Sequence, residues 1–254
     1  MGQLPRYGPD LTPIRPGAGH RAAVAGDLDR HMRITCLIGS FFLALASCSQ
    51  PDGTAPDPAP ASAFAPGNEG IDLSHHNGRV NWEALGSAPI DFVYLKATEG
   101  RDWKDTRFQE NWREASQRGW HVGAYHFYLL CKNGAAQAEN FIQSVEVRDG
   151  TLPPAVDLEY AHNCTPDGPK AAVLAEIDDF LIALEAEYGA PPVLYTTPEF
   201  HRDWLAERFP RNPVWMRRLS GPPEGDVLIW QYSMKGRVPG VDGFVDLNRI
   251  PDER

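Results

Sequence analysis

The sequence predicts an α/β protein with the architecture of a shortened TIM-like (β/α)5(β)3 barrel. Short apolar segments of strand length alternate with amphipathic helical segments, which is the pattern of a parallel sheet built from βαβ units. After Pro213 the predicted strands begin only about 13 and 17 residues apart, and these gaps are too short for a full helical crossover. Five βα units and three closing strands follow from this spacing, and the folded region of about 187 residues is short for a complete barrel of eight units.

Eight segments have the length and apolar character of strands, and several of them end in acidic or aromatic residues. Closure of a barrel makes the first and the last strand neighbours, so their ends are expected to meet. The predicted strands are residues 70–74, 91–97, 121–128, 153–159, 192–196, 213–218, 226–232 and 243–247.

Helical patterns fall between the early strands. Residues 106–118 and 135–147 carry apolar side chains on one face. Residues 170–188 form the clearest amphipathic stripe, which Gly189 ends. A shorter helix is expected after Pro198, because proline suits the first turn of a helix.

Residues 32–47 have the layout of a secretory signal: a basic start, an apolar run that is short for a bilayer span, and small residues before Cys48. The sequence Leu45-Ala46-Ser47-Cys48 resembles the bacterial lipobox, whose cysteine is lipidated. We therefore expect a cell-envelope protein held on a membrane through lipidated Cys48; the alternative is a buried core helix. Ser49 is compatible with the periplasmic side of an outer membrane.

The segments on either side of this signal are not expected to form a core. Residues 48–67 are mostly Pro, Ala, Ser, Gly and Asp, a composition typical of a tether. Residues 1–31 show no periodicity, and we interpret them as an upstream leader, with Met32 as the true start. A single domain, residues 68–254, remains for the barrel, and we expect it to be a monomer.

Charge and cysteine usage limit the possible partners. The chain has 24 Lys and Arg against 34 Asp and Glu, a net charge of −10, which argues against nucleic acid as a partner. Cys131 and Cys164 each follow a predicted strand end by a few residues, so both are expected at one rim of the barrel. In an exported protein such a pair favours a disulfide over two free thiols.

The strand at residues 153–159 ends in two carboxylates, Asp157 and Glu159. Side chains at i and i+2 of a strand point to the same side, about 6–7 Å apart. Two neighbouring carboxylates repel each other, so one of them tends to keep its proton at neutral pH. Cleavage of a glycosidic bond requires a proton donor beside an anion, although a solvated strand edge can carry the same pattern.

Acidic and aromatic side chains also gather at the ends of the other predicted strands. In parallel barrels the chemistry is found at the carboxyl ends of the strands, where rings can stack on sugars and acids can transfer protons. The sequence has no Gly-rich phosphate loop at these ends, which argues against nucleotides. The residues concerned are Asp72, Lys96, Glu99, Tyr125, His126, Tyr195, Trp215, Gln231, Tyr232 and Asp246.

Six blocks of the sequence occur in the order found in one enzyme family. They resemble glycoside hydrolase family 25, the Chalaropsis-type lysozymes, over about residues 70–250. This resemblance implies a (β/α)5(β)3 barrel that cleaves the β-1,4 bond between N-acetylmuramic acid and N-acetylglucosamine in peptidoglycan, without a cofactor. The blocks are Gly70-Ile71-Asp72-Leu73-Ser74-His75-His76-Asn77-Gly78, Tyr94-Leu95-Lys96-Ala97-Thr98-Glu99-Gly100, Gly123-Ala124-Tyr125-His126-Phe127, Asp157 with Glu159, Trp230-Gln231-Tyr232-Ser233, and Val245-Asp246-Leu247-Asn248.

The same resemblance implies that Glu159 is the general acid and that Asp72, Asp157 and Asp246 line its groove. Asp157 has three possible roles: nucleophile, base, or a group that orients the N-acetyl group of the substrate for attack on the anomeric carbon; we favour the third. Asp72 and Asp246 are expected to position the substrate or tune pKa values; the alternative is charge balance with Lys96 or Arg249. Sugar contacts are expected from Lys96, Glu99, Tyr125, His126, Tyr195, Trp215, Gln231 and Tyr232, with barrel packing as the alternative.

One departure from the family pattern follows Trp215. The family usually has small or aliphatic residues there, whereas this chain has Met216-Arg217-Arg218. Either arginine could contact a lactyl or peptide carboxylate of the substrate, or both could be solvated, and we favour solvation.

Two other functions would fit parts of the pattern. A non-catalytic glycan-binding lipoprotein would keep the groove, but it would not need the acid pair Asp157 and Glu159. A metal-dependent polysaccharide deacetylase would need ligands at metal spacing. The adjacent His75 and His76 are expected to point to opposite sides, which makes them poor joint ligands, so no metal site is expected.

Overall fold

The structure is a computed structural model that describes residues 59–146, 148–166 and 168–252. The predicted leader, the signal, Cys48 and most of the tether lie outside the described residues. In the described ranges, no helix combines the length and the apolar character that crossing a bilayer would need.

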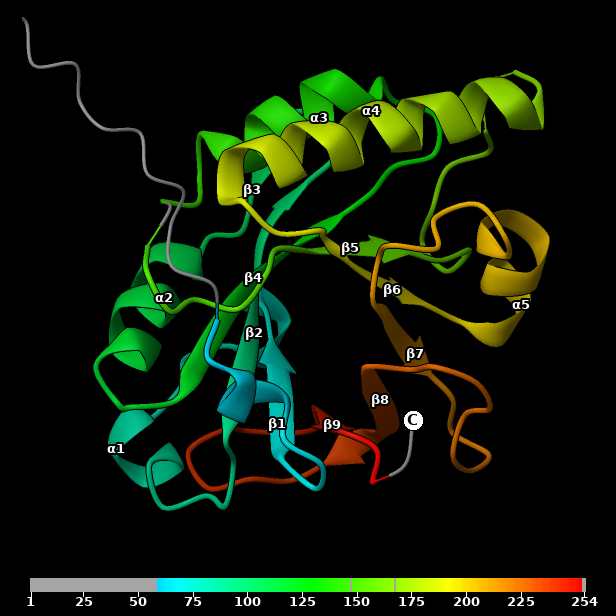
Figure 1. The fold of residues 1–254 in the computed structure, drawn as a ribbon. Coiled ribbons are helices and arrows are strands. Elements are labelled where there is room, and N and C mark those ends of the chain that lie inside the picture. The colour runs from blue at the N-terminus through cyan, green and yellow to red at the C-terminus, as the bar shows by residue number, and fades with distance from the viewer. Residues whose placement is uncertain (1–58, 147, 167, 253–254) are drawn as a thin grey trace, which may run out of the picture. The chain divides into compact units, whose positions relative to one another are not determined.

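Within these ranges nine strands form one sheet, and eight of them close into a barrel (Figure 1). The strands are β1 (Glu69–Leu73), β2 (Phe92–Glu99), β3 (Trp103–Lys104), β4 (His121–Phe127), β5 (Ala155–Leu158), β6 (Val193–Thr196), β7 (Val214–Arg217), β8 (Ile229–Gly236) and β9 (Val245–Arg249). β1 pairs with β2 on one side and with β9 on the other, which closes the ring. β3 pairs only with the end of β2. The predicted α/β barrel is confirmed.

The last strand of the barrel runs against its two neighbours. β9 is antiparallel to both β8 and β1, whereas the other pairs of neighbouring strands within the barrel are parallel. The short β3, outside the ring, is antiparallel to β2. The expectation that Asp246 ends this strand is wrong, because Asp246 is the second residue of β9. It still reaches the rim where the parallel strands end, since an antiparallel strand begins there. In the register, Asp246 lies directly opposite Asp72.

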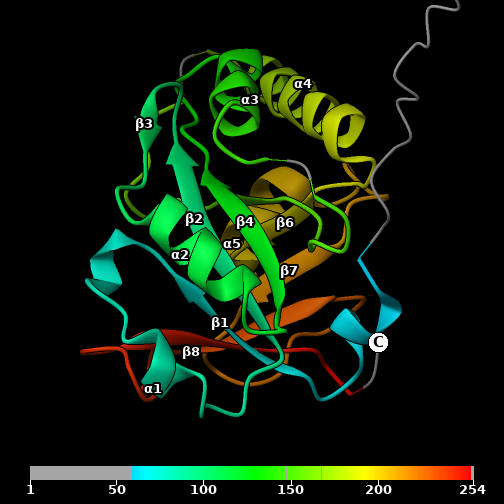
Figure 2. The ribbon, with the colours of Figure 1, turned by 90° about the vertical axis from the view of Figure 1, so that its left-hand side faces the viewer.

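Helices follow the early strands, as the pattern predicted. They are α1 (Trp82–Leu85), α2 (Phe108–Ser116), α3 (Gly134–Ile142), α4 (Lys170–Tyr188) and α5 (Pro198–Phe200), the last continued by a π-helical turn over His201–Leu205. α4 has the predicted bounds, and Gly189 ends it in the left-handed conformation with φ of 70°. The described connections after β7 and β8 contain no helix. Figure 2 shows α2 across β2 and β4, with α3 and α4 side by side.

A cluster of large apolar side chains fills part of the barrel interior. Phe92, Tyr94, Tyr195 and Trp215 belong to this cluster. Gly123 is required beside it, because a Cβ at that position would lie 2.3 Å from the ring of Tyr94.

The same cluster extends into residues that the sequence placed in the tether. Residues Ala61–Phe64 form a 3-10 turn, and Ala63 is fully buried with Phe92 and Ile250. Ala59 and Phe64 are partly buried against the same cluster. The prediction of a tether as far as residue 67 is therefore too long, because these apolar side chains pack against the barrel in spite of the surrounding Pro-rich composition.

Candidate active site

A groove of about 650 Å³ opens at the rim where the parallel strands end. The four predicted acids all line it: Asp72 from β1, Asp157 from β5, Glu159 just after β5, and Asp246 from β9. Asp157 and Glu159 both face the groove, in agreement with their i, i+2 spacing. The structure therefore brings together carboxyl groups that are far apart in the sequence.

Asp72 is held by two amide side chains from the closing strands. Its Oδ2 accepts hydrogen bonds from Nδ2 of Asn248 at 2.9 Å and from Nε2 of Gln231 at 3.2 Å. Burial and the nearby Asp246 raise the pKa of Asp72 well above its ordinary value, while the two amide donors act in the opposite direction. Asp72 is thus fixed in orientation, with Oδ1 left for other partners.

Asp157 has one oxygen without a partner. Its Oδ1 is buried and accepts no hydrogen bond from the described residues. Burial, and next the negative charge of Glu159, raise its pKa well above the ordinary value, and Lys96 and Arg217 counteract this. A buried acceptor without a donor is costly in a folded protein, so this oxygen is available for a donor that enters the groove.

Glu159 is paired with an arginine. Nη2 of Arg217 lies 2.6 Å from Oε2 of Glu159, and their side chains are 18% and 9% exposed. Burial raises the pKa of Glu159, whereas Arg217 and then His162 act to lower it. The expectation that the arginines after Trp215 are solvated is wrong for Arg217, because the last residue of β7 points into the groove.

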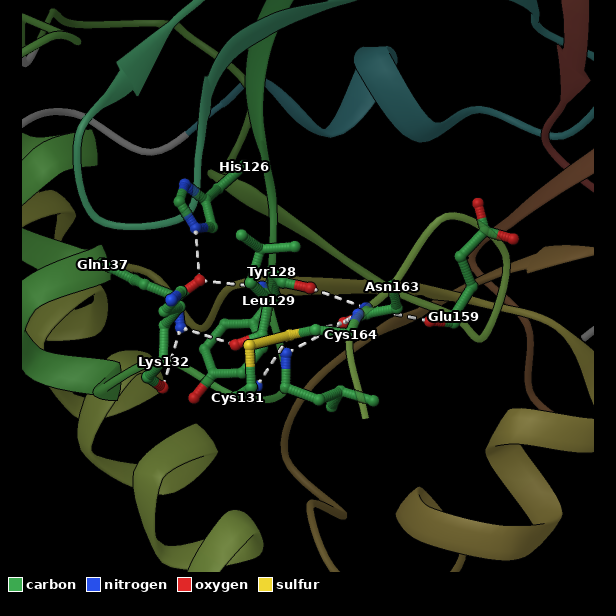
Figure 3. The surroundings of a disulfide bond; sticks show 10 residues. His126, Tyr128, Leu129, Cys131, Lys132, Gln137, Glu159, Asn163 and Cys164 are labelled. Atoms are coloured by element: carbon green, nitrogen blue, oxygen red, sulfur yellow. Dashed lines mark hydrogen bonds between the residues drawn. A yellow bond between two sulfur atoms is a disulfide. The ribbon is translucent and has the colours of Figure 1, made fainter. Parts of the chain in front are cut away.

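A disulfide supports the segment that carries Glu159. Cys131 and Cys164 are bonded, as predicted, and Asn163 beside them bridges two strand ends (Figure 3). Nδ2 of Asn163 donates to the carbonyl oxygens of Tyr128 and Glu159, and Oδ1 accepts from the backbone N–H of Leu130. The loops after β4 and β5 are therefore tied together next to the candidate acid.

An ion pair between Lys96 and Glu99 forms another wall of the groove. Nζ of Lys96 lies 2.7 Å from Oε2 of Glu99, and it also lies over the rings of Trp103 and Phe127. Lys96 and Glu99 both line the groove, as does Tyr125. This ion pair places a positive charge near Asp157.

The aromatic residues Tyr195 and Trp215 form the floor of the groove. They are only 8% and 2% exposed, so they offer little ring face for stacking on a sugar. Their polar atoms point to the amides that hold Asp72: Tyr195 donates to Oε1 of Gln231, and Nε1 of Trp215 donates to Oδ1 of Asn248. Gln231 was predicted to contact sugar, but it is only 1% exposed and does not reach the groove surface. Its amide group is hydrogen-bonded to Tyr195 and Asp72 instead.

Besides Gln231, two further predicted sugar-binding residues, His126 and Tyr232, do not line the groove. His126 is completely buried on the outer side of β4, where it contacts Thr98, Gln137 and the ring of Phe180. Tyr232 lies outside the groove and donates to Oε2 of Glu69. Successive residues of a strand point to opposite faces, so the neighbours of the inward-facing Tyr125 and Gln231 must face outward.

Several groove residues were not singled out as sugar-binding or catalytic from the sequence. Neither the exposed Phe244 nor Met234 gave a signal, because they come from the connection and strand that close the barrel. Asn248, which supports Asp72 from below the groove, was also missed, although it lies in a sequence block that resembled the family. The groove residues concerned are His76, Asn77, His162, Met234 and Phe244. Arg217 was considered as a carboxylate contact, but solvation was favoured.

The described residues contain no group of three His, Cys, Asp or Glu side chains placed to hold a metal ion. His75 instead contacts Asp105, with 2.8 Å between Nδ1 and Oδ2. The described groove is lined by carboxyl groups together with the guanidinium of Arg217, the ammonium of Lys96 and the imidazoles of His76 and His162.

A barrel with paired acids at this rim is typical of glycoside hydrolases, and comparison with known proteins identifies the family. The family model described as Glycosyl hydrolases family 25 matches residues 71–241. The chain is 36% identical over 203 residues to Lysozyme M1 of Streptomyces globisporus, covering 72% of this chain and 68% of that protein. It is 34% identical over 197 residues to the N,O-diacetylmuramidase of Chalaropsis sp, covering 70% and 93%.

Solved structures agree with this result. A bacterial lysozyme from Streptomyces coelicolor superimposes with a TM-score of 0.67 at 34% identity, covering 72% of this chain and 91% of that one. A family 25 glycosyl hydrolase from Bacillus anthracis gives a TM-score of 0.67 at 31% identity, covering 72% and 88%. The chain therefore belongs to glycosyl hydrolase family 25 and is a glycoside hydrolase of the lysozyme class.

Proposed function

We propose that this lysozyme cleaves the β-1,4 bond between N-acetylmuramic acid and N-acetylglucosamine, with Glu159 as the general acid and Asp157 as the group that directs the N-acetyl group of the substrate. The observation that carries the proposal is the buried, unpartnered Oδ1 of Asp157 beside Glu159 in the groove. That oxygen needs a donor, and the N–H of a 2-acetamido group is a donor of the right kind.

In the first step, the acetamide N–H donates to Asp157 and the acetamide oxygen attacks the anomeric carbon. The bond from that carbon to the leaving oxygen breaks as Glu159 gives its proton to this oxygen. Asp157 stabilises the positive charge that develops on the acetamide nitrogen. The product is a cyclic oxazolinium ion of the muramic acid residue and a free N-acetylglucosamine end.

In the second step, a water molecule attacks the anomeric carbon from the side that the leaving group vacated. Glu159, now ionised, accepts a proton from this water, and the acetamide oxygen leaves the carbon. Two inversions give net retention, and Glu159 ends the cycle protonated. Asp72 and Asp246 supply negative charge at the seam of the barrel, where it favours an oxocarbenium-like transition state.

Mass spectrometry of digested peptidoglycan tests the reaction. The proposal expects fragments that end in a reducing muramic acid. Fragments that end only in reducing N-acetylglucosamine, or release of acetate without chain cleavage, would contradict it. The same digestion in the presence of a chelator is expected to proceed unchanged, because the proposed chemistry uses no metal.

We further propose that the enzyme works at the cell envelope as a monomer, anchored by Cys48 after removal of residues 32–47. The support is the lipobox resemblance and the Pro- and Ala-rich composition that follows it. Intact mass of the natural protein is expected to show a diacylated or triacylated Cys48 at the N-terminus, without residues 1–31. A Cys48→Ala chain recovered in the membrane fraction as fully as the wild type would contradict the anchor.

A further inference from the structure

Arg217 occupies the groove next to the candidate acid and is only partly engaged. Its one charged partner among the described residues is Glu159, at 2.6 Å. The other contact of the guanidinium is the thioether of Met234, 3.8 Å from Nη1, and a thioether is a weak acceptor. A guanidinium has more N–H donors than these two contacts use, so Arg217 can bind a further anion with its remaining N–H groups.

The contact between Arg217 and Glu159 suits a resting enzyme better than a reacting one. A general acid must hold a proton, whereas an adjacent guanidinium favours the ionised carboxylate. Arg217 is the largest influence that lowers the pKa of Glu159 against the effect of burial. Glu159 therefore holds and donates a proton more easily when Arg217 leaves it and binds another anion.

The expected substrate carries such an anion. Muramic acid differs from N-acetylglucosamine by a lactyl arm on O3, which ends in a carboxylate or continues into a stem peptide with carboxylates of its own. A guanidinium binds carboxylates through two parallel hydrogen bonds. Glu159 is expected to protonate the oxygen bonded to the anomeric carbon of muramic acid. Because Arg217 contacts Glu159, we expect it to lie close to this muramic acid.

We propose that Arg217 is a specificity-determining residue that binds a carboxylate on the 3-O arm of muramic acid and thereby releases Glu159 to act as the acid. Glu159 then takes up one proton from solvent and passes it to the glycosidic oxygen. This inference rests on the proposed function, because it assumes muramyl substrates and Glu159 as proton donor.

The other charged and titratable groups around Glu159 lie on other elements, so a substitution of Arg217 leaves them in place. They are Asp72 on β1, Asp157 on β5, His162 after β5, Tyr195 on β6 and Asp246 on β9. Arg217 also lowers the pKa of Asp157, Tyr195 and Asp246, so its removal raises their pKa values together with that of Glu159. The pH profile is therefore measured together with the preference for charged strands, which reports the contact with the substrate carboxylate.

Arg218 offers a matched control. It is the next residue in the chain, but its side chain turns away from the groove and its Nη1 donates to the carbonyl oxygen of Pro222. Arg218→Gln removes the same charge from the same segment without removing a groove contact.

The experiment measures kcat/KM of the full-length protein against pH on three sets of glycan strands. One set has free lactyl carboxylates, one has the lactyl groups converted to methyl amides, and one has intact stem peptides. The wild type and Arg218→Gln are expected to cleave at least one charged set more than tenfold faster than the amide set. Arg217→Gln is expected to lose this preference, and its alkaline limb on the amide set should move to higher pH.

The charged set that is favoured identifies the carboxylate as lactyl or peptide. Equal rates of the wild type on all three sets would overturn the proposal, as would an Arg217→Gln variant that keeps the tenfold preference. A variant that slows equally on every set, with an unmoved pH profile, would show a structural role and would also overturn it.

Binding provides a readout that does not depend on turnover. Glu159→Gln is expected to bind the favoured charged set at least tenfold more tightly than the amide set, and Glu159→Gln/Arg217→Gln should bind both equally. If the wild type released no muramic acid ends, the proposed function would fail, while these affinities would still decide whether Arg217 recognises the carboxylate.

Discussion

Asp72 of β1 and Asp246 of β9 lie directly opposite each other in the antiparallel pair that closes the barrel. Two amide side chains fix Asp72, whereas Asp246 is half-buried, and burial raises its pKa to about 6. The seam of the barrel thus holds two acids close together, at the same rim as Asp157 and Glu159. A fold that gathers these four carboxyl groups, and Glu99 besides, in one groove loses stability when they all ionise.

Asp246→Asn is expected to stabilise the protein at neutral pH. The raised pKa means that Asp246 contributes its full stability below about pH 4, and that this contribution is lost as the pH rises through about 6. The change from 3.8 to about 6 corresponds to at most about 3 kcal/mol, which solvent reduces to about 1 kcal/mol. Urea denaturation at pH 7 should show this gain, and at pH 4 the gain should vanish.

The exposed Asp242 provides the control for this substitution. Asp242→Asn should leave the free energy of unfolding unchanged at both pH values. A stability gain of Asp246→Asn that is as large at pH 4 as at pH 7 would contradict the assignment to ionisation of this carboxyl group.

Glu159→Gln is expected to reduce kcat by about 10²–10⁴, the usual contribution of a general acid, without loss of fold. The amide keeps the shape of the side chain but has no proton of suitable acidity to give. Turnover on cell-wall glycan and the melting temperature should be measured together. A folded Glu159→Gln protein that retained more than a tenth of wild-type kcat would remove Glu159 from the proposed role.

Asn248→Leu is expected to lower both stability and activity. Asn248 is completely buried and joins Trp215 to Asp72. Its loss leaves Nε1 of Trp215 without an acceptor, at about 1–3 kcal/mol, and leaves Asp72 with one of its two amide donors, Gln231. Adding Trp215→Phe removes the unpaired N–H and should restore part of the free energy of unfolding, but not the rate, because Asp72 still lacks the donor that Asn248 supplied. Full recovery of the rate in the double variant would show that Asn248 acts through Trp215 alone.

Removal of the disulfide should affect the acid as well as stability. The bond closes a loop with a sequence separation of 33 residues, for which chain entropy predicts a loss of about 3–4 kcal/mol. Because Asn163 next to Cys164 holds the carbonyl of Glu159, we expect kcat to fall several-fold in Cys131→Ser/Cys164→Ser at a temperature where the variant is folded. An unchanged kcat would separate the disulfide from positioning of Glu159.

The two tyrosines Tyr195 and Tyr232 should differ in their effect on catalysis. Tyr195→Phe frees Gln231, one of the two supports of Asp72, and should lower kcat/KM about tenfold, since a buried amide oxygen loses its donor. Tyr232→Phe breaks a contact with Glu69 outside the groove and should stay within twofold of wild type. Equal losses in the two variants would contradict the inward and outward placement.

Local pattern was sufficient for the features that depend on one segment. Helix α4 was predicted with its observed bounds because its apolar stripe and Gly189 mark both its face and its end. The shared orientation of Asp157 and Glu159 follows from the period of a strand. The same period, applied to Tyr125 and His126, would have shown that only one of the two can face the groove.

Features that depend on distant segments were not accessible in this way. Spacing of 13 to 17 residues between strand starts excludes a helix but is compatible with either strand direction, so the antiparallel course of β9 was missed. The ion pair of Arg217 joins residues 58 positions apart, and only the register of β5, β6 and β7 places them in contact. A pattern within one strand end cannot distinguish such an arginine from a solvated one.

Asp157 is proposed to direct the N-acetyl group of the substrate while Glu159 supplies the proton. Proton NMR of the first product from a soluble muramyl glycan tests these roles, because the anomeric signal appears before mutarotation. The new muramic acid end is expected to form as the β anomer. Initial formation of the α anomer would mean a single inversion by water and would contradict participation of the N-acetyl group.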